Sequence, residues 1–243
     1  MESLAQELLE AIIDHVPPIN AWRCSLVARR WRRRSQQRYF SEIMFTHEPE
    51  VVRWCTNIPQ DPDGIPSYVR DVEFQCIRCW RDPTLLSRVL KGFSRVKILT
   101  VWETGIPPDE VCKIVSSGGF GRDIISLTLI SSVSTVPTLM SLALSLPNLR
   151  ELMIDSVVQA EPPVLTPPDK TWQGRPLESL ELALLWSKEL EFIALCGVTA
   201  HRVDLSVGDV TIEKIIACSS ETMRELTLQG TCLPWNFVPR EQY

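Results

Sequence analysis

The sequence predicts an α/β fold in which a module of three short helices precedes a repeated stack of strands and helices. Two patterns lead to this prediction. Within the first 45 residues apolar side chains recur at helical spacing, and from Val72 onward seven apolar-x-apolar centres recur every 23 to 28 residues. The charge changes at the same place, because the first 45 residues hold seven arginines and five carboxylates, whereas the whole chain has a net charge of −5.

The composition excludes several classes of protein. Hydrophobic residues make up 44% and charged residues 23% of the 243-residue chain, which is typical of a folded domain and not of a disordered or membrane protein. The start Met1-Glu2-Ser3-Leu4 lacks the features of a secretory signal, so we expect a cytoplasmic or nuclear protein with reduced cysteines. The net charge argues against a protein dedicated to nucleic acid.

The amino-terminal module begins with an apolar helical stripe. Its members are Leu4, Leu8, Leu9, Ile12, Ile13 and Val16. We expect Pro17 and Pro18 to end this helix and Asn20 to cap a second one. The second apolar face consists of Trp22, Leu26, Val27 and Trp31, and a third group, Tyr39, Phe40, Ile43 and Met44, continues at helical spacing. Three short helices make a weak core, so such a module usually needs a neighbour to cover its apolar surface.

Two motifs stand out in this module. The first consists of Leu4, Glu7, Leu8 and Leu9, and the second of Ser25, Leu26, Val27, Arg29 and Trp31. They resemble the F-box family, whose pattern is Leu-Pro-x-Glu-[Leu/Ile]-Leu and then Ser-Leu-Val-x-[Arg/Lys]-x-Trp. Ala5 stands where the family usually has a proline that touches the Skp-type adaptor, which leaves the strength of adaptor binding open. The resemblance implies docking on that adaptor and, through it, on a cullin. The implied adaptor-binding residues are Leu4, Leu8, Leu9, Ile12, Leu26, Val27 and Trp31.

The seven later centres predict strands. They are Val72/Phe74, Leu99/Val101, Leu127/Leu129, Leu152/Ile154, Leu180/Leu182, Val203/Leu205 and Leu226/Leu228. Helices are predicted between them at Thr84–Phe93, Asp109–Ser116, Val136–Leu146, Lys188–Cys196 and Ile212–Cys218, and the proline-rich segment 156–176 predicts a loop. The segments LPNLRELMID, RPLESLELA and TMRELTLQ resemble irregular leucine-rich repeats, which form solenoids.

The predicted organisation has three parts. They are an F-box at 1–46, a connecting segment at 47–68, and a leucine-rich-repeat-like solenoid of about seven units at 69–243. No carboxy-terminal capping unit is evident, so we expect a truncated product or a degenerate final unit. The rival fold is a doubly wound α/β domain, but Ser117–Gly121 does not fit a phosphate-binding glycine motif and instead predicts a helix-ending turn.

Residues for catalysis or metal binding are sparse. Cys76 and Cys79 form a lone C-x-x-C motif without the second pair that a zinc site needs, and the chain has only three histidines. No hydrolase, metalloprotease or kinase motif occurs. We therefore expect no enzyme activity, no metal and no cofactor.

Alternation along the predicted strands gives a second candidate surface. The residues that flank the buried pairs face outward, and they include seven carboxylates and one arginine. Apolar residues lie near the middle of this surface. The predicted substrate-binding set is Ile98, Trp102, Ile130, Glu151, Met153, Asp155 and Glu181. We expect this face to bind a protein with a basic, partly apolar segment.

Together these features predict a substrate-recognition adaptor of a Skp–cullin–F-box ubiquitin ligase, with no membrane partner. Two alternatives stay open. One is a leucine-rich-repeat scaffold outside any ligase, and the other is a nucleic-acid-associated protein that uses the basic run Arg29–Arg34. A solvated helix face also accounts for that run. The target, its degron and the oligomeric state stay open.

Overall fold

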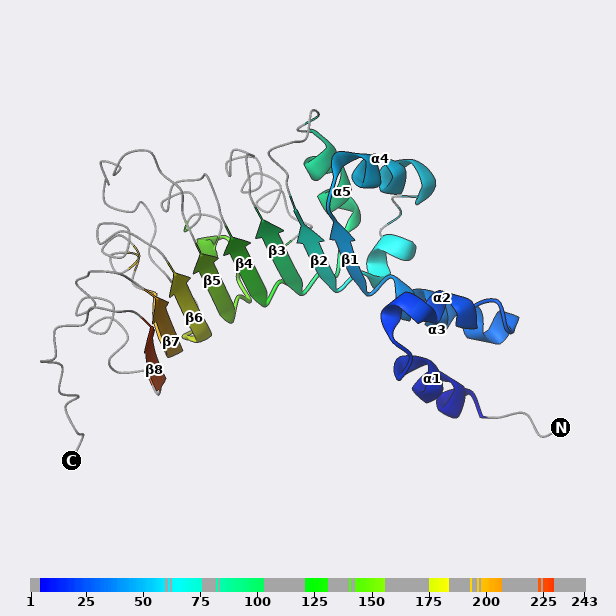
Figure 1. The fold of residues 1–243 in the computed structure, drawn as a ribbon, viewed down its shortest axis with the longest axis horizontal. Coiled ribbons are helices and arrows are strands. Elements are labelled where there is room, and N and C mark those ends of the chain that lie inside the picture. Colours follow the sequence, from blue (N-terminus) through cyan, green and yellow to red (C-terminus); the bar gives the residue numbers. More distant parts are fainter. Residues whose placement is uncertain are drawn as a thin grey trace, which may run out of the picture.

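The computed structural model is a mixed structure in which a helical module leads into a parallel sheet (Figure 1). The structure describes residues 5–59, 61, 63–75, 82, 84–102, 121–130, 140, 143–155, 175–183, 193, 196, 198–206, 223 and 225–229.

The helical module consists of α1 (Gln6–Asp14), α2 (Pro18–Cys24) and α3 (Arg29–Tyr39). Helices α1 and α2 both pack on α3. The small interior contains Leu9 and Ile13 from α1, Ala21 from α2 and Ser35 from α3, each of which is buried. The apolar side chains of the opposite helix faces are left outside this interior.

Pro18 begins a helix, which corrects part of the sequence prediction. Pro17 is the residue before α2 and Pro18 is its first residue, so Asn20 lies inside the helix and does not cap it. Proline suits this first position because its missing N–H has no helical acceptor there and its φ angle is already helical. The first helix ends earlier, with His15 as its C-terminal cap.

The predicted continuation of helical structure through Met44 is wrong. Helix α3 ends at Tyr39, and Ile43 and Met44 lie in strand β1 (Glu42–Phe45). Strand β1 pairs in parallel with β2 (Asp71–Phe74), which aligns Ile43 with Val72 and Phe45 with Phe74. This pairing with a distant segment overrides the local helical spacing. The residues up to 46 that we assigned to the helical module thus include the first strand of the sheet.

The sheet has eight described strands in the order β1 to β8, and all neighbouring strands are parallel. The remaining strands are β3 (Ile98–Trp102), β4 (Ser126–Ile130), β5 (Glu151–Asp155), β6 (Leu177–Ala183), β7 (Ala200–Ser206) and β8 (Glu225–Gln229). The seven predicted apolar centres lie in β2 to β8, so these strand predictions are confirmed. Figure 1 shows the strands side by side in one curved row, with α1–α3 beyond β1.

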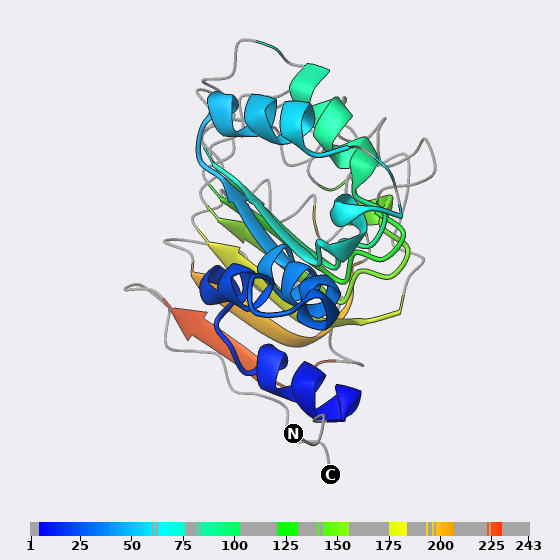
Figure 2. The same cartoon turned by 90° about the vertical axis from the view of Figure 1, so that its right-hand side faces the viewer.

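The predicted connecting segment 47–68 contains regular structure. Helix α4 (Glu48–Asn57) is followed by the 3₁₀ helix η1 (Ile65–Tyr68), and α5 (Thr84–Gly92) confirms the helix predicted at Thr84–Phe93. Figure 2 shows α4 and α5 lying together, apart from α1–α3. Val51 and Trp54 of α4 belong to the same buried core as the sheet. This segment therefore packs as part of the sheet's core.

Two rows of side chains form the inner face of the sheet. One row is Val72, Leu99, Leu127, Leu152 and Leu180, and the other is Phe45, Phe74, Val101, Leu129, Ile154 and Leu182; all are buried. Met140 and Ala143, within the predicted helix Val136–Leu146, are buried against the same core, as is Cys196. Burial raises the pKa of the Cys196 thiol to about 11, as expected for a core cysteine.

One backbone contact recurs where successive strands begin. The carbonyl oxygen of Ser41 accepts hydrogen bonds from the N–H groups of Arg70 (2.8 Å) and Asp71 (3.0 Å). The carbonyl of Arg70 accepts from Lys97 (2.7 Å) and Ile98 (3.0 Å) in the same way. The carbonyls of Lys97, Ile125 and Arg150 repeat the arrangement toward the following strand. Consecutive segments of the chain therefore enter the sheet with the same local geometry.

Several predictions fall outside the described residues. They are the helices Asp109–Ser116 and Ile212–Cys218, the loop at 156–174, the pair Cys76 and Cys79, and the chain beyond residue 229. Of the predicted turn Ser117–Gly121, the described residue Gly121 has a φ of 98°, which glycine adopts readily.

Candidate functional site

The first candidate site is an exposed apolar surface on the helical module. Leu8 is 58% exposed and Ile12 is 50% exposed, and because they lie four residues apart they share one face of α1. In the turn between α2 and α3, Leu26 and Val27 are exposed to 74% and 67%. Single exposed apolar residues are common on protein surfaces, but four of them in one small helical module make this module a candidate binding site.

The predicted adaptor-binding residues that the structure describes divide into two groups. Leu8, Ile12, Leu26 and Val27 are exposed, as docking requires. Leu9 is only 3% exposed and lies in the interior of the module. Trp31 is half-buried and its indole N–H has no hydrogen-bond partner, while Leu4 lies outside the described residues.

The predicted set lacked the exposed apolar residues of α2. Ile19 is the second residue of α2 and Trp22 lies one turn later, and both are exposed. Trp22 belonged to the predicted second apolar face. Ile19 follows two prolines, so no periodic pattern surrounded it that could mark it.

An ion pair holds α1 against α3. Arg34 donates from Nε to Oδ1 of Asp14 (2.7 Å) and from Nη2 to Oδ2 of the same carboxylate. This hydrogen bonding, partly opposed by burial, lowers the pKa of Asp14. One turn on, Nε of Arg38 donates to the carbonyl oxygen of Val16 (3.2 Å). These contacts fix the face of α1 that stays exposed.

Residues 1–41 match the F-box domain. The chain carries an F-box domain. F-box domains typically bind Skp-type adaptors, and the match covers the exposed apolar surface of α1, α2 and the turn after α2. No curated protein matches the chain.

Ala5, which replaces the usual F-box proline, is the N-terminal cap of α1 and is exposed. Its φ of −57° lies within the range that a proline ring imposes. No side chain caps the helix at this position. The backbone at the start of the F-box helix is thus compatible with the family's proline.

The second candidate site is the outward face of the sheet. In the register of the strands, Trp102 lies beside Ile130, which lies beside Asp155, and Ile98 is separated from Glu151 by Ser126. Trp102 and Ile98 are exposed to 38% and 37%. Glu151 and Glu181 are exposed, and Met153, Ile130 and Asp155 are partly buried. The sheet therefore brings the predicted substrate-binding residues onto one surface.

Strand β1 extends this acidic face beyond the predicted residues. Its Glu42 aligns with Asp71 and its Met44 aligns with Glu73. Burial raises the pKa of Asp71, and the neighbouring charges of Glu42 and Glu73 raise it further. Glu42, Asp71 and Glu73 therefore form an acidic patch at this end of the sheet.

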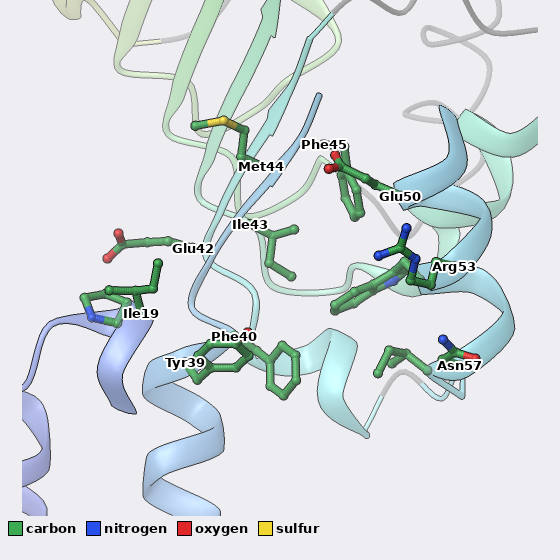
Figure 3. Close-up of a pocket in the computed structure, with 13 residues that line it drawn as sticks. Ile19, Tyr39, Phe40, Glu42, Ile43, Met44, Phe45, Glu50, Arg53 and Asn57 are labelled. Atoms are coloured by element: carbon green, nitrogen blue, oxygen red, sulfur yellow. The ribbon is translucent and has the colours of Figure 1, made fainter. Parts of the chain in front are cut away.

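A cavity of about 780 Å³ lies against the free edge of β1, between α2, the end of α3 and α4 (Figure 3). Aromatic rings form its inner wall, where Trp54 makes edge contacts with Phe40 and Phe45 at centroid distances of 5.9 Å. Burial raises the pKa of Glu50, but hydrogen bonds from the N–H and hydroxyl groups of Thr46, together with the N–H group and charge of His47, lower it overall. The cavity is therefore lined both by F-box helices and by the first strand of the sheet with its following helix, α4.

The structure offers no metal chemistry within its described residues. No group of three or more histidine, cysteine or acidic side chains is placed to hold a metal ion there. Among the same residues, no helix is long and apolar enough to cross a membrane.

Proposed function

We propose that this chain is the substrate-recognition subunit of a Skp–cullin–F-box ubiquitin ligase. The observation that carries the proposal is the exposed face of Leu8 and Ile12 on α1, within residues that match the F-box domain. Burying these side chains against an adaptor would remove apolar surface from water, which is the main driving force of association. The buried neighbours Leu9 and Ile13 hold the helix in place beneath that surface.

We further propose that the strands belong to a divergent leucine-rich-repeat solenoid. Two features support this assignment: the strands follow one another in chain order, and the same carbonyl contact recurs from Ser41 to Arg150. In a solenoid each repeat contacts only its neighbours, and the stack buries what a single repeat cannot. Strand β1, which adds to the seven predicted strands, would be the first strand of this stack, and only two residues separate it from α3.

The outward strand face is the proposed target-binding surface. Its carboxylates favour a basic segment of a target protein, and Trp102 beside Ile130 offers an apolar anchor at the centre. The protein would then act without bond chemistry of its own. By holding a target near the ubiquitin-charged enzyme, it raises the effective concentration of the target's lysines.

Co-purification with a Skp-type adaptor tests this function. Replacing the exposed pair by aspartate (Leu8→Asp with Ile12→Asp) places two charges in the proposed interface, and adaptor capture should fall at least about tenfold. Val52→Asp is the control, since Val52 is an exposed apolar residue of α4, outside the F-box match. Adaptor capture that is equal in the double variant and the control would contradict docking through α1.

The same experiment distinguishes a ligase subunit from a leucine-rich-repeat scaffold. A ligase subunit should bring down a cullin together with the adaptor, and both should be lost in the double variant. Adaptor without cullin would instead support a leucine-rich-repeat scaffold that uses the F-box outside a ligase.

A further inference from the structure

A polar pocket of about 590 Å³ lies between the F-box helices and the first turns of the sheet, separate from the two candidate surfaces above. Arginines dominate its wall. They are Arg33, Arg34, Arg38, Arg70 and Arg95, and the lining carboxylates are Asp14 and Asp63. The pocket therefore carries an excess of positive charge in a chain whose net charge is negative.

Two of these arginines are already paired within the molecule. Arg34 is bound to Asp14, and Nη1 of Arg38 lies 3.6 Å from the carboxylate of Glu42. In the part of the chain that the structure describes, Arg33 and Arg95 form no ion pair, and both side chains are exposed at the pocket. Their guanidinium groups are free to bind an anion.

Arg70 forms the inner part of the wall. Its Nη1 donates to the carbonyl oxygens of Ser67 (2.6 Å) and Val69 (3.0 Å), and the residue is partly buried. Burial and the nearby charge of Arg95 lower its pKa, and Asp123 opposes them only in part. A partly desolvated cation beside a second cation is stabilised most by an anion that enters the same space.

We propose that this pocket binds a small phosphate ester that carries several negative charges. Guanidinium groups match phosphate oxygens with two parallel hydrogen bonds, and the volume is in the range of ~300–1,000 Å³ typical of small-ligand sites. Arg33 comes from α3 and Arg95 follows α5, so one ligand would contact both the F-box helices and the sheet. The ligand would thereby stabilise the junction of the two parts.

A small ester fits the pocket better than a nucleic acid does. Sites for single-stranded nucleic acid combine basic groups with several aromatic rings that stack on bases. Among the described residues that line this pocket, Tyr68 is the only one with an aromatic ring. The described lining therefore offers guanidinium groups that can bind phosphate, but not the several aromatic rings on which bases would stack.

Calorimetric titration of the full chain with inorganic tripolyphosphate tests the proposal, at an ionic strength of about 0.15 M so that distant charges are screened. We expect one saturable site per chain. Arg33→Gln with Arg95→Gln should weaken binding at least about tenfold, because each charge-assisted contact is lost. Arg32→Gln with Arg122→Gln is the matched control: it removes the same charge from exposed residues that do not line the pocket.

Three outcomes would overturn the proposal. One is no saturation at millimolar tripolyphosphate, and another is an equal loss in both double variants, which would indicate diffuse attraction. The third is tighter binding of a single-stranded oligonucleotide that depends on Arg32, which would assign the basic run to nucleic acid. Thermal melting of both variants shows whether each is folded, and adaptor capture is measured separately, so failure here leaves the proposed ligase function untouched.

Discussion

The carboxylate of Asp14 and the guanidinium of Arg34 form a two-contact ion pair that ties the end of α1 to the middle of α3. Both side chains are more than a third exposed, so solvent screens the pair. Its role is to orient α1, since the rest of that contact is a small apolar interior around Leu9 and Ile13.

The stability that this pair contributes should depend on pH. The folded pKa of Asp14 lies below its ordinary value of 3.8, so the contribution is present above that value and is lost as the pH falls through the folded pKa. Asp14→Asn should lower the free energy of unfolding by less than about 1 kcal/mol at pH 7. Urea unfolding at pH 7 and in acid measures the difference, which should shrink in acid; a constant difference would mean that the charge is not involved.

Replacement of Leu8 or Leu9 by alanine should affect different properties of the protein, namely adaptor binding and folding stability. Leu9→Ala opens a cavity in the helical module and should cost about 2–4 kcal/mol of stability. Leu8→Ala, at an exposed site, should change stability by less than about 0.5 kcal/mol but weaken adaptor capture. Urea unfolding and adaptor capture on both variants check this, and equal stability losses would contradict the observed orientation of α1.

Ala5→Pro should strengthen the start of the F-box. The backbone at Ala5 already has a φ of −57°, so proline should restrict the unfolded chain and add about 0.4–1 kcal/mol of stability. Adaptor affinity should rise with it, measured by titration against the purified adaptor. Ala11→Pro is the control: it places proline inside α1 and should cost about 3 kcal/mol. A stability loss from Ala5→Pro would show that this site does not accept the ring.

Asp71→Asn should stabilise the protein at neutral pH. Burial and the charges of Glu42 and Glu73 raise the folded pKa of Asp71 above 3.8, so ionisation costs more in the folded state than in the unfolded state. The gain should be present above the folded pKa and disappear below 3.8, where the carboxyl is protonated in both states. Thermal melting across this range measures it, with exposed Glu151→Gln as the control. A variant less stable than the parent at pH 7 would contradict the prediction.

Charge reversal on the strand face should abolish binding of a basic target. Glu151→Lys with Glu181→Lys changes two exposed carboxylates of the proposed surface, and like charges then oppose the partner. Asp61→Lys with Glu178→Lys makes the same change in charge at exposed residues outside the proposed surface. Quantitative mass spectrometry of captured proteins compares the two. Unchanged capture by the Glu151/Glu181 variant would remove this face as the recognition surface.

The strands from β2 onward could be predicted because their apolar pairs recur in the sequence at nearly constant spacing, and the pairs of β2 to β6 are buried. Strand β1 could not, since Tyr39, Phe40, Ile43 and Met44 fit a helical period equally well, and only pairing with Asp71–Phe74 decides between them. Likewise Pro18 can either follow a helix or begin one, and here it begins α2.

The sequence predicted the residues of some candidate surfaces better than those of others. Alternation placed Trp102 and Ile130 on one face, because strand geometry makes that assignment local. Helical spacing could not separate Leu8 from Leu9 on α1, since both are apolar and only packing on α3 distinguishes them. The arginine pocket was beyond prediction, because Arg33 and Arg95 are far apart in the sequence and meet only through the fold.

Only Phe40 and Ser41 separate helix α3 from strand β1, and the carbonyl oxygen of Ser41 is itself bonded to the next segment through the N–H groups of Arg70 and Asp71. Such a short connection restricts rotation of the helical module relative to the sheet. A protein bound to the strands would therefore be held at a fixed orientation and distance from a protein bound to α1. Inserting a few glycines into this connection would make that orientation and distance variable without changing either binding surface.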